Sequence, residues 1–166
     1  MALQPRPRGR HLVRLDRRQE LERSADLIVN ICKAARRLYD IDFDPRLRGL
    51  TTAMSAEAQM LTQRAIDAYV DSDEALAAAL DDMDSKLDEL QLDFTQAIFT
   101  AHQHEALELR QAVQLALICR YYERIGDHAV NIGERVTFMI TGWLPEYTGA
   151  ARVDLRRRQA GPEPAS

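Results

Sequence analysis

Residues 121–134 have the sequence YYERIGDHAVNIGE and lie in a long run without proline, in which apolar residues recur every three or four positions. This period predicts the interior of an α-helix. Glu123, Asp127 and Asn131 follow one another at intervals of four, so such a helix carries their oxygen atoms in one row. Carboxylates in a row beside a packed seam lose part of their water, and we expect them to need a cation, a base or another partner. The expected seam consists of Leu115, Ile118, Tyr122, Ile125, Ala129, Ile132, Val136 and Met139.

The same polar row occurs a second time in the chain. Residues 22–31 (ERSADLIVNI) align with residues 123–132 (ERIGDHAVNI) at an offset of 101, and six of the ten positions are identical. Glu22, Asp26 and Asn30 therefore repeat the order and spacing of the first row. Two copies of one pattern on two helices indicate a molecule with two similar halves.

Length, composition and charge narrow the class of protein. A chain of 166 residues forms one domain or two small ones, and 46% hydrophobic with only 6% aromatic residues and little glycine favours an all-α fold. We expect neither a membrane-inserted segment nor a signal peptide, and therefore a cytoplasmic protein with both cysteines, Cys32 and Cys119, buried and reduced. Residues 51–150 contain 17 acidic and 6 basic side chains, a net charge of −11. Such a body disfavours nucleic acid as a partner and suits a cation.

Periodicity and helix-stop signals predict four helices. The last three would form an antiparallel bundle with the first packed alongside, and residues 1–10 and 147–166 are expected to be disordered. The first helix should bury Leu21, Ala25, Ile28, Cys32, Ala35 and Tyr39, and the second should bury Met54, Ala58, Leu61, Ala65 and Ala68. The helices are expected at residues 11–39, from Pro45 or Thr51 to Val70, at 73–102 and at 105–141.

The third helix combines a regular apolar seam with many acidic residues on its other faces. We expect these carboxylates to be solvated, unless they face the polar rows, in which case they would extend a cation site. They are Asp81, Asp82, Asp84, Asp88, Glu89 and Asp93.

The polar rows favour binding over catalysis. The chain lacks the Glu-x-x-His pairs of di-iron bundles, a P-loop, a glycine-rich dinucleotide motif and a nucleophile with its base. Oxygen-rich rows suit hard or borderline cations, with iron as the first candidate and manganese or magnesium as alternatives. Arg23 and Arg124 would neutralise excess negative charge. The candidate ligands are Glu22, Asp26, Asn30, Glu123, Asp127, Asn131 and Glu134, with His128 as a further possibility. Alternatively, the rows are structural ion-pair edges of a metal-free helical adaptor.

Residues 121–134 resemble the motif of the PhoU family of bacterial phosphate-uptake regulators, and residues 21–31 resemble its counterpart in the first repeat. The resemblance extends over about residues 11–142. It implies two similar three-helix bundles, each ending in a helix with a Glu/Asp-x-x-x-Asp row that binds metal clusters. It also implies a cytosolic negative regulator, dimeric or larger, that couples the phosphate-specific ABC transporter to a sensor histidine kinase at the inner face of the membrane.

The chain departs from that family pattern in its number of helices. A full member has six, whereas residues 11–40 correspond to the last helix of a first repeat and residues 45–142 to a complete second repeat. The first helix would then expose the seam that two further helices bury. We expect homo-oligomerisation through that seam, since a large exposed apolar surface seeks a partner.

Overall fold

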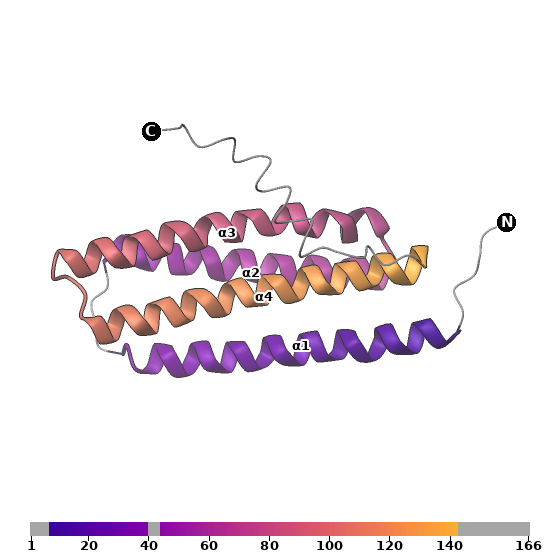
Figure 1. The fold of residues 1–166 in the computed structure, drawn as a ribbon, viewed down its shortest axis with the longest axis horizontal. Coiled ribbons are helices and arrows are strands. Elements are labelled where there is room, and N and C mark those ends of the chain that lie inside the picture. The colour runs from indigo at the N-terminus through magenta and orange to yellow at the C-terminus, as the bar shows by residue number, and fades with distance from the viewer. Residues whose placement is uncertain (1–6, 40–43, 143–166) are drawn as a thin grey trace, which may run out of the picture.

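The computed structural model describes residues 7–39 and 44–142, with side chains from residue 18 onward. These residues contain helices and turns but no strand, which confirms the all-α prediction. The four helices lie along one common direction (Figure 1). They are α1 (Pro7–Arg36), α2 (Pro45–Asp71), α3 (Glu74–Gln103) and α4 (Leu109–Thr141). None of them is both long and apolar enough to cross a membrane.

Helices α2, α3 and α4 form the predicted antiparallel bundle. All five residues predicted to face inward from α2 are buried, as are most of the apolar seams of α3 and α4. The contact between α3 and α4 is especially close because α4 has glycine at two contact positions. A Cβ atom on Gly133 would lie 2.8 Å from the carbonyl oxygen of Ala77, and one on Gly126 would lie 2.7 Å from Leu87 Cδ2. The two glycines therefore set the distance between these helices.

The ends of the helices follow ordinary capping chemistry. Asp44 and Asp73 accept hydrogen bonds from backbone amides in the first turns of α2 and α3, at 2.7 and 3.0 Å. Gly142 ends α4 with φ of +73°, as its position in the sequence predicts. The start of α4 was predicted too early, near Glu105. That residue has a positive φ within a turn, and Glu108 instead opens the helix with a capping box.

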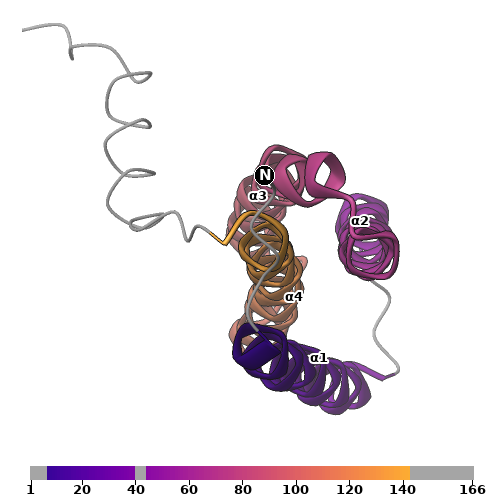
Figure 2. The ribbon, with the colours of Figure 1, turned by 90° about the vertical axis from the view of Figure 1, so that its right-hand side faces the viewer.

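Helix α1 packs against α4 and, among the described residues, makes no comparable contact with α2 or α3 (Figure 2). It begins at Pro7, four residues before the predicted start, because proline is compatible with the first turn of a helix. Residues 1–6 and 143–166, which include most of the two segments expected to be disordered, lie outside the described residues. An apolar pocket of about 190 Å³ separates the C-terminal part of α1 from α2 and α4.

The predicted inner seam of α1 is wrong. Of its six residues only Leu21 is partly buried, while Cys32, also expected to be buried, is exposed. The residues buried instead are Glu20, Ser24, Leu27, Ala34 and Leu38. The buried face of α1 contains two polar side chains whose partners come from α4, so a search for the most apolar stripe selects the wrong side of the helix.

Candidate functional site

The polar row of α4 begins beside α3, because the Asp88 carboxylate of that helix influences Glu123. Glu123, Asp127, Asn131 and Glu134 are all partly buried, as expected for residues at the edge of a packed seam. Between the first two lies Gly126, whose missing side chain leaves room for a group from α3. A side chain of α3 can therefore approach the α4 backbone at this part of the row.

Helix α3 presents carboxylates of its own at this point. A Cβ atom on Gly126 would collide with Oδ1 of Asp84, so the Asp84 carboxylate lies against the α4 backbone. Asp84 is 8% exposed, and Asp88, one turn further along α3, is partly buried and close enough to influence Glu123. We call Asp84, Asp88, Glu123 and Asp127 the carboxylate cluster. The acidic residues of α3 therefore divide into solvated ones and two that face the α4 row.

The sequence contained a signal for the two α3 members of this cluster. Asp84 and Asp88 are four residues apart, the same spacing as Glu123 and Asp127, but four further acidic residues surround them in α3. Only their burial distinguishes them from their neighbours. Sequence reasoning identified the acidic face as a possible extension of the cation site without selecting these two residues.

Glu123 has an unfavourable electrostatic environment within the carboxylate cluster. Burial raises the pKa of its carboxyl group above the usual value, and the negative charges of Asp127 and Asp88 raise it further, whereas Arg120 opposes both effects. Its side chain is 13% exposed, Oε1 pairs with Arg120, and Oε2 is buried without a hydrogen-bond partner. Glu123 thus carries a carboxylate whose charge is disfavoured where it lies, which is a condition that a bound cation relieves.

The oxygen donors of the carboxylate cluster suit a hard or borderline cation, but the four side chains do not surround one position. The four carboxylates offer only oxygen ligands, and Glu123 has an unused buried oxygen. Within the described residues, however, no three acidic, histidine or cysteine side chains converge closely enough to hold a metal ion.

The polar row of α1 lies apart from the carboxylate cluster. Glu22 and Asp26 are exposed and Asn30 is partly buried, while α1 turns Glu20, Ser24 and other residues toward α4. The fold therefore keeps the two predicted rows apart, as two separate surfaces, and ligation of a metal by the α1 row stays a prediction.

In the described part of the chain, no ion pair joins either predicted arginine to the row that it was expected to neutralise. Glu123 pairs with Arg120, one turn earlier in α4, and not with its sequence neighbour Arg124. Successive helical residues point about 100° apart, whereas residues three apart share a face, which explains the difference. Arg23 lies 3.6 Å from the buried Glu20. This contact does not involve Glu22 or Asp26 of the α1 row.

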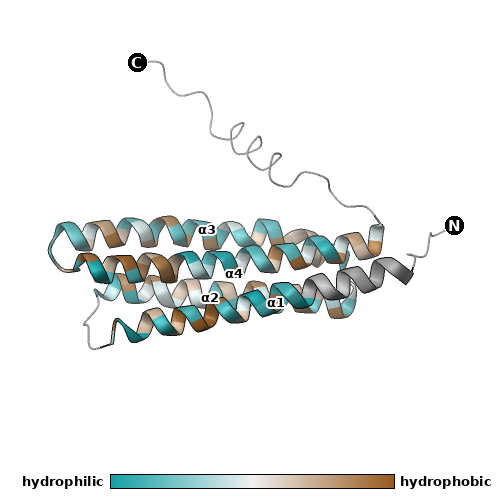
Figure 3. Cartoon of the chain, turned by 60° about the horizontal axis from the view of Figure 1, so that its bottom comes forward, coloured by the Kyte–Doolittle hydropathy of each residue, from teal (hydrophilic) through white to brown (hydrophobic). Residues whose placement is uncertain are grey.

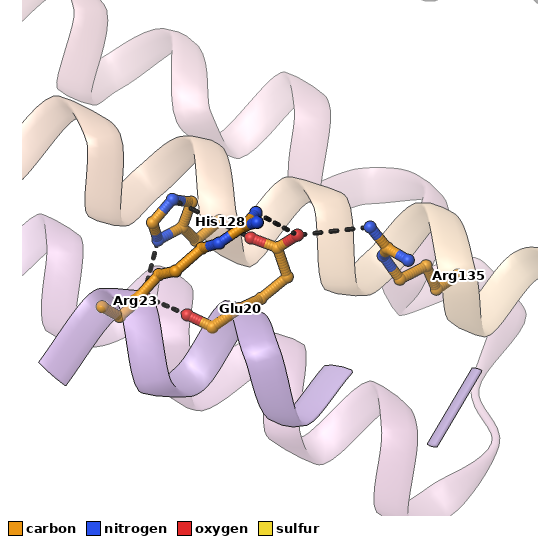
Figure 4. Close-up of polar contacts among 5 residues, drawn as sticks. Glu20, Arg23, His128 and Arg135 are labelled. Atoms are coloured by element: carbon orange, nitrogen blue, oxygen red, sulfur yellow. Dashed lines mark hydrogen bonds and ion pairs between the residues drawn. The ribbon is translucent and has the colours of Figure 1, made fainter. Parts of the chain in front are cut away.

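His128 belongs to a polar contact between α1 and α4 (Figure 4). Its Nδ1 atom lies 3.0 Å from the Ser24 hydroxyl, and its Nε2 atom lies 3.8 Å from Glu20 Oε2. Glu20, 2% exposed, also accepts a hydrogen bond of 3.2 Å from Arg135. Burial lowers the pKa of His128, and nearby Glu20 partly offsets this effect. His128 thus joins two helices and contributes no donor atom to the cluster.

Comparisons with known proteins agree with this architecture. A family model described as the PhoU domain matches residues 51–136. The phosphate-specific transport system accessory protein PhoU homolog 1 of Mycobacterium tuberculosis is 35% identical over 127 residues, covering 76% of this chain and 57% of that protein. The homologue of the same name in Methanothermobacter thermautotrophicus is 36% identical, covering 73% of this chain and 55% of that protein. No solved structure matches the chain.

A third relative, the PhoU homolog of Clostridium acetobutylicum, is 27% identical and is covered over 56% of its length. The chain thus spans a little over half the length of the curated relatives it matches. The family model covers the helices that carry the carboxylate cluster, and the relatives are similar over about three quarters of the chain. The chain belongs to the PhoU family.

Proposed function

We propose that this chain is a cytoplasmic negative regulator of phosphate uptake, which acts on the phosphate ABC transporter and its sensor histidine kinase through metal-dependent protein binding. Its relatives are named as accessory proteins of a phosphate-specific transport system, and these names support a role in phosphate uptake. The carboxylate cluster, with its unpaired Glu123 oxygen, is the observation that supports a role for metal. Regulation by binding suits a helical protein whose candidate site offers charge and no nucleophile.

In this proposal the metal is held between α3 and α4. Asp84 and Asp88 would contribute ligands from one helix and Glu123 and Asp127 from the other, with Asn131 and Glu134 as further oxygen donors on α4. Iron is the first candidate, and manganese or magnesium are the alternatives. The bound cation would neutralise the cluster and make the α3–α4 surface suitable for a protein partner.

Metal content of purified variants tests the site. Wild-type protein and the Asp127→Ala variant would be loaded with iron, manganese or magnesium, desalted and measured by elemental analysis. We expect a reproducible metal-to-chain ratio in the wild type, its loss in Asp127→Ala, and equal helicity by circular dichroism. Asp93→Ala is the matched control, since it removes an exposed carboxylate from α3. Equal metal content in the Asp127→Ala variant and the wild type would contradict the proposed site.

The metal-free adaptor is the second candidate function. The observation in its favour is that no three potential ligands converge among the described side chains. Binding of purified phosphate ABC transporter to the chain, compared before and after treatment with a chelator, separates the two functions. Metal-dependent regulation predicts that the chelator weakens binding, whereas an adaptor binds equally well in both samples.

A further inference from the structure

Helices α3 and α4 expose large apolar side chains near the turn that connects them. Leu92 and Phe99 of α3 are 71% and 59% exposed, and Leu109 and Val113 of α4 are 67% and 48% exposed. We call these four residues the apolar patch. Figure 3 shows apolar residues on the part of α4 that follows this turn. Several large apolar side chains gathered at the surface of a protein mark a place where it binds something.

The register of the two helices places members of the patch at one level. The Sγ atom of Cys119 lies 3.9 Å from the carbonyl oxygen of Gln91. Because the helices are antiparallel, each step along α3 toward the turn corresponds to one step back along α4. Phe99 therefore lies level with residues 109–113 of α4.

The apolar patch lies on the same side of these helices as the carboxylate cluster. One row of α3 repeats at intervals of four, four, three and four, and consists of Asp84, Asp88, Leu92, Thr95 and Phe99. One row of α4 repeats at intervals of four, three, four, three and four, and consists of Leu109, Val113, Ala116, Arg120, Glu123 and Asp127. The two rows face the same side, because Asp88 of the first row influences the carboxyl group of Glu123 in the second.

Both rows change from acidic to apolar in the same direction, from the carboxylate cluster toward the turn. Asp88 and Phe99 are eleven residues apart in one helix, which corresponds to about 16 Å. The surface thus has an acidic end and an apolar end, and a partner helix of about three turns is long enough to contact both.

The apolar end of this surface is held in place by the turn itself. A ring nitrogen of His102, Nδ1, lies 2.8 Å from the carbonyl oxygen of Leu107, and the Leu107 side chain is buried. The amide of Ala106 donates a hydrogen bond of 3.0 Å to the carbonyl oxygen of Ala101. A surface that is already ordered loses less entropy when a partner binds.

The exposure of the patch does not depend on the first copy of the internal repeat. At the offset of 101, Ala25 and Cys32 of α1 correspond to Gly126 and Gly133, the positions where α4 packs closely against α3. Helices that complete the first copy would therefore pack on α1 at Ala25 and Cys32. Within the described residues, α1 makes no comparable contact with α3.

We propose that the apolar patch and the carboxylate cluster together form the docking surface for an amphipathic helix of the regulated partner protein. Apolar side chains of that helix would cover the patch, and lysine or arginine side chains at its other end would lie over the cluster. This docking surface deepens the proposed function, and it rests on that function only in requiring a protein partner. Four carboxylates exceed the charge of one divalent cation, so basic side chains are attracted with or without metal.

The charge of the chain distinguishes this occupant from two others. Residues 51–150 have a net charge of −11. Anionic lipid and a second copy of the acidic bundle would both be repelled at the acidic end of the surface. A basic segment would be attracted there, so the charge selects a basic amphipathic helix.

Designed peptides test the chemistry of the partner. The probe is a fluorescein-labelled helical peptide of about 18 residues, with leucine along one face of its first half and lysine along the same face of its second half. A second peptide has glutamate in place of each lysine. We expect the glutamate peptide to bind the full chain at least about tenfold more weakly than the lysine peptide. Fluorescence anisotropy in the presence of a chelator measures both dissociation constants.

Substitutions in the patch test its location. Phe99→Asp and Val113→Asp should each weaken binding of the lysine peptide at least about tenfold, because each places a charge where apolar side chains would dock. Both variants should keep their helicity, since these side chains are about half exposed. Val70→Asp is the matched control, because it changes a valine that is 70% exposed near the end of α2, beside the start of α3 and away from the patch.

Phe99→Asp also separates the docking surface from the proposed metal site. This variant should load metal like the wild type but bind purified phosphate ABC transporter at least about tenfold more weakly. Wild-type protein that does not bind the transporter would contradict the proposed function, whereas the peptide measurements decide on the docking surface alone.

Three results would overturn the docking surface. The first is equal binding of the lysine and glutamate peptides. The second is binding of the lysine peptide to Phe99→Asp and Val113→Asp as tightly as to the wild type. The third is cosedimentation of the wild type with phosphatidylglycerol vesicles that Phe99→Asp abolishes, which would assign the patch to a membrane surface.

Discussion

At the scale of single residues, Glu123 shows how a buried carboxylate can reduce the stability of the fold. Its carboxylate is placed among other carboxylates, one of its oxygens has no hydrogen-bond partner, and its pKa is raised. A group with a raised pKa takes up a proton more readily in the folded state, so ionisation at neutral pH disfavours folding. Selection for stability alone would not retain this arrangement, which is consistent with a functional role for the cluster.

The Glu123→Gln variant should therefore be more stable than the wild type when metal is absent. We expect the free energy of unfolding at pH 7 to rise by about 1 kcal/mol, because the amide removes a buried charge that Arg120 compensates only in part. The gain should disappear as the pH falls toward about 4.5, where the wild-type carboxyl group also becomes neutral. Urea denaturation in the presence of a chelator measures both values.

The control for this substitution is Glu89→Gln. Glu89 is 69% exposed and pairs with Lys86 on the surface of α3, so its substitution should change stability by less than about 0.5 kcal/mol. A Glu123→Gln variant that is less stable than the wild type would indicate that Arg120 already compensates the charge.

At the scale of helices, α4 and α1 differ in how far sequence predicts their packing. The apolar stripe of α4 contacts α2 and α3 and could be identified from periodicity, since burial there follows hydrophobicity. In α1 the apolar stripe that includes Ala25, Ile28 and Cys32 is exposed, and the buried side includes Glu20 and Ser24. Their partners His128 and Arg135 are more than 100 residues away in sequence, so no local pattern indicates that these polar residues are buried.

The close contact of α3 with α4 yields a prediction about two glycines. Gly133→Ala should lower the free energy of unfolding by about 1–3 kcal/mol, because its Cβ would lie 2.8 Å from a backbone oxygen of α3 that cannot move aside freely. Gly49→Ala in α2 should have the opposite effect and raise stability by up to about 1 kcal/mol. Nothing lies within 4 Å of that position, and alanine favours the helix. Thermal denaturation of both variants checks the contrast, and equal shifts would show that the glycines do not control helix spacing.

At the scale of the whole molecule, the sequence predicted the bundle, the α4 row and the family, but only half of the carboxylate cluster. Glu123 and Asp127 were identified because their row is repeated in the chain. Asp84 and Asp88 have no such counterpart, and their membership depends on how α3 is rotated against α4. The rotation of a helix about its axis is fixed by tertiary packing. The many acidic residues of α3 do not by themselves show which of them face α4.

Whole-molecule stability should also depend on pH through the contact between α1 and α4. The pKa of His128 is lowered in the folded state, mainly by burial, so the unfolded chain binds this proton first as the pH falls. We therefore expect the free energy of unfolding to decrease as the pH drops below about 6.5, by at most about 1.4 kcal/mol per pH unit. His128→Gln should flatten this slope, whereas His104→Gln, which changes an exposed residue, should leave it unchanged. Denaturant unfolding between pH 5 and 7.5 makes the comparison, and an unchanged slope in His128→Gln would show that another group controls the pH dependence.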